Sequence, residues 1–82
     1  MKTLKQIKEE LKDMQKNTIK LKSARGNEYN VIIVSKSYFN NILKFKSLKV
    51  IYHEVEGISI YNVSYLKNGE TKNYFVRVFG GM

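Results

Sequence analysis

The 82-residue sequence has no cysteine, no proline and no tryptophan, and His53 is its one histidine. Without cysteine there is no disulfide framework and no thiolate metal site, so nothing indicates an oxidising compartment. A histidine-based metal site or a Ser-His-acid triad would need partners that this composition scarcely supplies. We therefore expect no metal, no small-molecule cofactor and no catalytic residue.

Long apolar runs are missing as well. The N-terminal stretch 1–13 is charged throughout, unlike a signal peptide, and no segment approaches the roughly 18 consecutive apolar residues of a membrane span. Hydrophobic residues still make up 43% of the chain and aromatic residues 12%, which favours a folded chain over a disordered one. We expect a single soluble domain over residues 1–82, cytoplasmic and without membrane contact.

Acidic residues are scarce in the middle of the chain. The net charge is +8, of which residues 18–49 carry +6, residues 1–17 carry +2 and residues 50–82 carry none. Such an excess attracts polyanions, although a lysine-rich composition can also serve solubility alone. The basic residues that we expect to contact nucleic-acid phosphates are Lys20, Lys22, Arg25, Lys44, Lys46 and Lys49.

The first element expected is an amphipathic helix within residues 1–17. Thr3 and Gln6 have the spacing of a capping box. Apolar residues then recur at helical spacing, namely Leu4, Ile7, Leu11 and Met14. The opposite side alternates lysines with acids, which predicts a solvated face of ion pairs.

A hairpin is expected over residues 18–34, where the apolar period changes to two. A two-residue type II′ turn at Gly26-Asn27 would place Leu21 opposite Ile32 on the core face. The same register would place the two strand lysines opposite apolar residues on the other face, pairing Lys20 with Ile33 and Lys22 with Val31.

A short second helix is expected within residues 35–46. Ser35 or Ser37 would cap it, and an apolar stripe follows at Tyr38, Ile42 and Phe45. Lysines gather at its C-terminal end, which the helix dipole alone would favour.

Residues 48–79 predict a three-stranded meander with turns at Glu56-Gly57 and Asn68-Gly69. Pairing around the second turn sets Val63 opposite Tyr74 and Tyr61 opposite Val76. The helix-covered face of the last strand is then Tyr74, Val76 and Val78, whereas its other face carries Phe75, Arg77 and Phe79.

The expected order α-β-β-α-β-β-β indicates an α+β fold, namely a small two-layer sandwich of an antiparallel sheet with two helices on one face. Three roles are open for the face of Phe75, Arg77 and Phe79: a second core layer, a self-association face in a homodimer, or a binding platform.

The stretch "YFVRVF" looks distantly similar to the base-stacking strand of RNA-recognition-motif domains, which would place Phe75, Arg77 and Phe79 against bases. The similarity covers about six residues. The preceding basic and glycine positions read Lys72-Asn73, and the β-α-β-β-α-β order of that family is missing, so no family is assigned.

Three functions therefore compete. The first is a non-enzymatic protein that binds nucleic acid or a nucleic-acid-bound complex, with the six basic residues on phosphates and the aromatic strand stacking on bases. The second is a protein-binding inhibitor or accessory protein of phage or mobile-element type. The third is a small ribonuclease or toxin that uses His53, Arg77 and a tyrosine as general acid and base.

Overall fold

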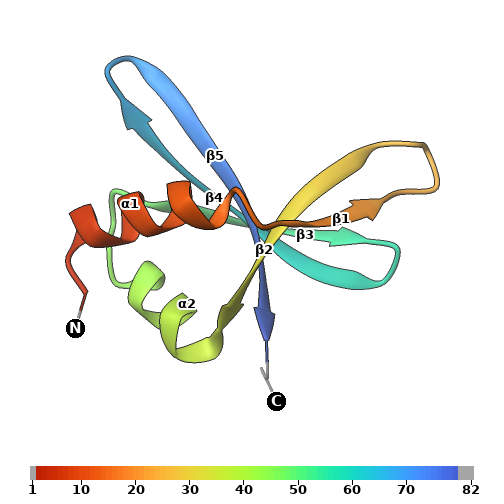
Figure 1. The fold of residues 1–82 in the computed structure, drawn as a ribbon, viewed down its shortest axis with the longest axis horizontal. Helices are drawn as coiled ribbons and strands as arrows, with labels where there is room; N and C mark the ends of the chain where they lie inside the picture. The colour runs from red at the N-terminus through yellow and green to blue at the C-terminus, as the bar shows by residue number, and fades with distance from the viewer. Residues whose placement is uncertain (1, 80–82) are drawn as a thin grey trace.

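The computed structural model of the protein describes residues 2–79 and shows an α+β fold with two helices and a five-stranded, mixed and curled sheet (Figure 1). Across the described residues, neither helix has the length and apolar character needed to span a bilayer. The elements are α1 (Leu4–Met14), β1 (Ile19–Lys22), β2 (Glu28–Ser35), α2 (Lys36–Leu43), β3 (Lys49–Val55), β4 (Ile58–Lys67) and β5 (Glu70–Phe79). The strands lie in the sheet in the order β1-β2-β5-β4-β3.

Helix α1 begins with the predicted capping box. The hydroxyl of Thr3 accepts a hydrogen bond from the backbone N–H of Gln6 at 3.2 Å, and the Gln6 side chain accepts one from the Thr3 N–H at 2.8 Å. These two bonds satisfy N–H groups that a helix start leaves free. Ile7 and Leu11 are fully buried, which confirms the apolar stripe as the core face.

The sheet is mixed, so the antiparallel sheet of a simple two-layer sandwich is a wrong prediction. β5 lies parallel to β2, with Ile32 beside Val76, while the other pairs are antiparallel. The predicted β4–β5 register is confirmed by the pairs Val63–Tyr74 and Tyr61–Val76. A parallel pair needs a long crossover connection, and α2, β3 and β4 supply it between β2 and β5.

One hydrophobic cluster joins both helices to the sheet. Ile7 and Leu11 of α1 and Ile42 of α2 meet sheet side chains that include Val63 and Val76, all fully buried. Tyr74 is buried in the same cluster and Val78 packs against it, so these strand residues face the helices as predicted.

The β1–β2 hairpin has a different register from the one predicted. Ile19 pairs with Val31 and Leu21 with Tyr29, a shift of three positions. A five-residue loop replaces the two-residue turn, closed by a bond from the Ser23 N–H to the Asn27 carbonyl at 2.8 Å. Because an odd shift exchanges the two faces of a strand, the strand lysines now lie beside polar residues, Lys20 beside Asn30 and Lys22 beside Glu28.

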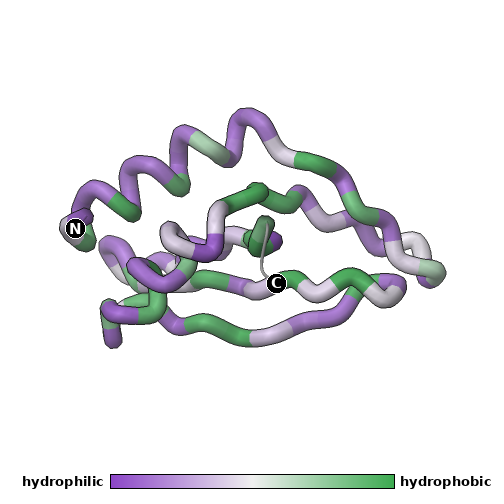
Figure 2. The backbone as a smooth tube through the Cα atoms, turned by 90° about the horizontal axis from the view of Figure 1, so that it is seen from below, coloured by the Kyte–Doolittle hydropathy of each residue, from purple (hydrophilic) through white to green (hydrophobic). Residues whose placement is uncertain are grey.

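A second hydrophobic cluster occupies the sheet face that turns away from the helices. Its buried members are Val31, Val55 and Ile60, and Phe75 packs against them. The sheet curls so that the β1–β2 and β3–β4 hairpins extend toward the same end of the molecule, one above the other in Figure 2. Leu21, Tyr29 and Ile58 complete this cluster. Phe75 therefore belongs to a second core layer.

Candidate nucleic-acid interface

The six basic residues expected to bind phosphates lie in two groups at opposite ends of the fold. Lys20 and Lys22 are exposed on β1, and Arg25 is exposed in the loop that leads to β2. The second group comprises Lys44, Lys46 and Lys49, all exposed between α2 and the start of β3. Figure 1 shows loop 23–27 at the right end and segment 44–49 at the left. The six do not form one continuous surface.

The aromatic strand divides into a packed part and an exposed part. The Phe75 ring makes edge contacts with Tyr29 at 5.1 Å and with His53 at 5.9 Å between ring centroids. Phe79 is 71% exposed, and Arg77 is exposed beside it. Both line an open hollow of about 450 Å³ that also includes Ile19, Ile33 and Val78. None of the six predicted phosphate-binding residues lines this hollow.

His53, the residue on which a ribonuclease mechanism would depend, is exposed on β3 and rests against the Phe75 ring. Among residues 2–79, no cluster of three or more His, Asp or Glu side chains is placed to hold a metal ion.

Another part of the surface is shaped by the end of β4, where the strand is paired on one side only. β3 begins at Lys49, which lies opposite Ser64. β4 continues to Lys67, and residues 65–67 pair with β5 alone. This free edge of β4 lies next to α1 (Figure 1).

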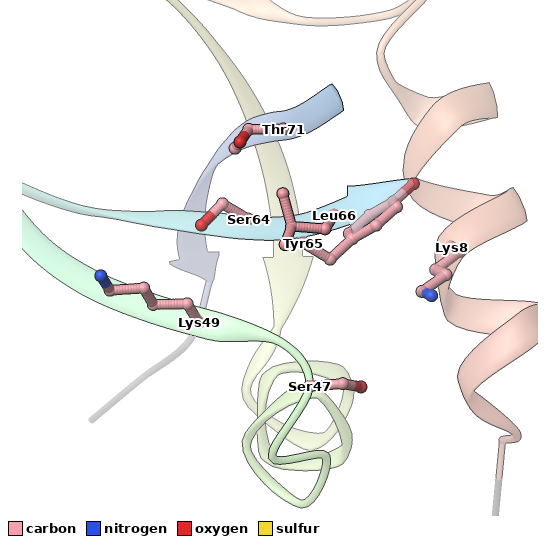
Figure 3. Close-up of a pocket in the computed structure, with 7 residues that line it drawn as sticks. All are labelled: Lys8, Ser47, Lys49, Ser64, Tyr65, Leu66 and Thr71. Carbon is pink, nitrogen blue, oxygen red and sulfur yellow. The ribbon is translucent and has the colours of Figure 1, made fainter. Parts of the chain in front are cut away.

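A cleft of about 500 Å³ lies across this free edge, and we call it the central cleft (Figure 3). Lys8 of α1 and Lys49 of β3 contribute the positive charges, and no carboxylate of residues 2–79 lines the cleft. The side chain of Leu66 lies between them in Figure 3. Hydroxyl groups complete the lining, from Ser47, Ser64, Tyr65 and Thr71.

Two further hollows adjoin the central cleft through shared residues. One shares Tyr65 and runs along the β4–β5 hairpin, and the other shares Lys8 and runs along α1. Their linings add four lysines and two acids, of which Glu70 is paired with Lys72 at 3.3 Å. We call the combined area the lysine surface, formed by Lys5, Lys8, Lys12, Lys49, Lys67 and Lys72.

Tyr65 lies at the centre of the lysine surface, where it lines both the central cleft and the hollow along the β4–β5 hairpin. The Lys8 ammonium lies 4.7 Å from the centroid of its ring, within the range of a cation–π interaction. Burial, with Tyr74 stacked beside it, raises the pKa of Tyr65 to about 12. The phenol therefore stays protonated at neutral pH and adds no negative charge to the cleft.

Only Lys49 of the lysine surface was among the residues predicted from the sequence. The helix lysines were assigned to a face of ion pairs, but within residues 2–79 the ion pair found on α1 joins Glu10 to Lys2, which precedes the helix. The sequence feature that indicates these residues is the helical spacing of Lys5, Lys8 and Lys12, which places them on neighbouring turns of one side of α1.

Comparisons with protein families, with curated proteins and with solved structures found no match to this chain.

Proposed function

We propose that this protein is a small non-enzymatic nucleic-acid-binding protein and that the lysine surface is where it contacts phosphates. The observation that supports this most strongly is the arrangement of three adjoining hollows, lined by six lysines, around the free edge of β4. Lysines held by a helix and by three strands form a concave positive area, which attracts a polyanion more than scattered charges do.

The balance of charge on this area favours a phosphate backbone as ligand. Among residues 2–79, Glu9 and Glu70 are the acids that line the hollows, and Glu70 is already paired with Lys72. The remaining lysines have no carboxylate within ion-pair distance in the described part of the chain. Binding of a strand would release counterions, so the affinity should fall as salt rises.

The test is fluorescence anisotropy with labelled 20-nucleotide DNA and RNA strands at several salt concentrations. A triple variant, Lys8→Gln, Lys49→Gln and Lys67→Gln, removes three charges from the lysine surface. We expect it to bind roughly tenfold to a hundredfold more weakly at low salt, and to lower the slope of log K against log salt by about 2.

A charge-matched control removes the same number of charges from the other end of the molecule, through Lys20→Gln, Lys22→Gln and Arg25→Gln. This variant should keep most of the affinity, because these residues lie away from the lysine surface. An absence of binding to either strand at low salt would rule out the proposed function. Equal losses in the two triple variants would rule out the lysine surface as its site.

A second candidate function, binding of a protein or of a second copy of the chain, is favoured by the exposed apolar patch around Arg77. Ile19, Ile33 and Phe79 are 53%, 37% and 71% exposed and line one hollow. Sedimentation equilibrium would detect a homodimer, and Phe79→Asp should shift such a dimer to monomer. A dimer that persists in this variant would count against the patch as its interface.

A further inference from the structure

We infer that the central cleft holds an unpaired nucleotide, so that the ligand of this protein is single-stranded rather than duplex nucleic acid. The inference rests on the proposed function and specifies its ligand. It is carried by Leu66, an apolar side chain in an otherwise cationic and hydroxyl-lined cleft.

Leu66 is 73% exposed, more than the other exposed large hydrophobic side chains of the described residues. It pairs across the hairpin with Thr71, and both line the central cleft. Contact with an apolar side chain does not stabilise a bound phosphate group. It does stabilise a bound nucleobase, because contact between the base face and the apolar side chain removes both surfaces from water.

The polar groups around Leu66 suit the rest of a nucleotide. Lys8 and Lys49 flank Leu66 from different elements, and the Tyr65 ring restricts the Lys8 ammonium. Ser64 and Thr71 offer hydroxyls that can both donate and accept hydrogen bonds to a base edge or a sugar. The volume of about 500 Å³ lies within the range of clefts that hold small molecules, about 300–1,000 Å³.

Duplex nucleic acid cannot fill this cleft in the same way. In a duplex the base faces are stacked on one another, and only base edges and phosphates are accessible from the grooves. A base face becomes available when the strand is single or when a loop leaves bases unstacked. The cleft therefore favours an unpaired strand.

The experiment compares three probes at one low salt concentration: a 20-nucleotide thymidine strand, a 20-base-pair duplex and an abasic strand of the same length. The wild-type protein should bind the thymidine strand at least threefold more tightly than the other two. Leu66→Ala should remove this preference for the thymidine strand. Its affinity for that strand should fall roughly threefold to tenfold, and its affinity for the abasic strand should stay the same. Leu43→Ala is the matched control, because Leu43 is 54% exposed and lines a different hollow on α2.

The outcomes separate the inference from the function on which it rests. A duplex bound as tightly as the thymidine strand, with Leu66→Ala without effect on either, overturns the inference and leaves nucleic-acid binding in place. Failure to bind any of the three probes overturns both. Circular dichroism checks that each variant is folded. We expect both to fold, because Leu43 and Leu66 are exposed and their replacement leaves the core intact.

Discussion

Lys8 of α1 holds its ammonium group over the ring of Tyr65 of β4, with 4.7 Å between Nζ and the ring centroid. Tyr65 is itself buried in the cluster that joins the helices to the sheet. One residue thus has two roles: its ring packs in the core, and the same ring restricts a cation at the rim of the central cleft. The position of this charge is therefore coupled to the packing of the fold.

Replacement of Tyr65 should separate these roles. Tyr65→Phe keeps an aromatic face under Lys8, and we expect its affinity for a single strand to equal that of the wild type. Tyr65→Leu removes the ring, and we expect a roughly twofold to fivefold loss, equivalent to a cation–π interaction of about 0.5–1 kcal/mol. Anisotropy on variants shown to be folded measures both. A loss in Tyr65→Phe equal to that in Tyr65→Leu would assign the effect to the hydroxyl instead.

The second core layer predicts that two phenylalanines of one strand face differ sharply in their contribution to stability. Phe75→Ala removes a ring packed beside Val31 and Ile60, and should lower the free energy of unfolding by about 2–3 kcal/mol. Phe79→Ala removes a largely exposed ring and should change it by less than about 0.5 kcal/mol. Urea denaturation of both variants gives the comparison. Equal and small effects would mean that the curl of the sheet does not bury this face.

The turn of the β3–β4 hairpin offers a stabilising substitution. Glu56 has a φ of 50° and Gly57 a φ of 80°, whereas the β4–β5 turn has Asn68 at 53° and Gly69 at 79°. Asparagine tolerates the left-handed region better than glutamate does. Glu56→Asn should therefore raise the free energy of unfolding by about 0.5–1 kcal/mol, and Asn68→Glu should lower it by a similar amount. Denaturation at moderate salt, which suppresses the effect of the changed charge, tests both directions.

The Lys2–Glu10 contact predicts a contribution to stability that depends on pH. A hydrogen bond from Lys2 at 2.9 Å lowers the pKa of Glu10 below its ordinary value of 4.5. The contribution is therefore complete above pH 4.5 and is lost as the pH falls through the folded-state pKa. Glu10→Gln should flatten the acid side of the stability profile, and Glu9→Gln should not. A profile of Glu10→Gln that matches the wild type would contradict this assignment.

Local signals were enough to predict several features of the fold. The Thr3–Gln6 capping box and the Asn68-Gly69 turn both depend on residues that are near one another in sequence, and both are present in the structure. The second of these also fixed the β4–β5 register, because a two-residue turn leaves the strands one way to pair.

Features that depend on distant contacts could not be predicted in the same way. The predicted β1–β2 register was wrong for two reasons. Ser23 closes a longer loop than the two-residue turn expected at Gly26-Asn27. Leu21 also packs in a cluster that forms only when the sheet curls. The lysine surface was missed for a similar reason. Lys8, Lys49 and Lys67 belong to three elements. They share one area because β3 begins opposite Ser64 and does not extend along residues 65–67 of β4.

The central claim, that nucleic acid binds between α1 and the β4–β5 hairpin, is tested most directly by ¹H–¹⁵N NMR during titration with a 20-nucleotide single strand. The account predicts that the largest amide shifts fall on Lys8, on Lys49 and on residues 64–72, and that they diminish as salt is added. Loop 23–27 should change little, since it lies at the other end of the molecule. Shifts concentrated in β1 and loop 23–27, or no shifts at low salt, would contradict the account.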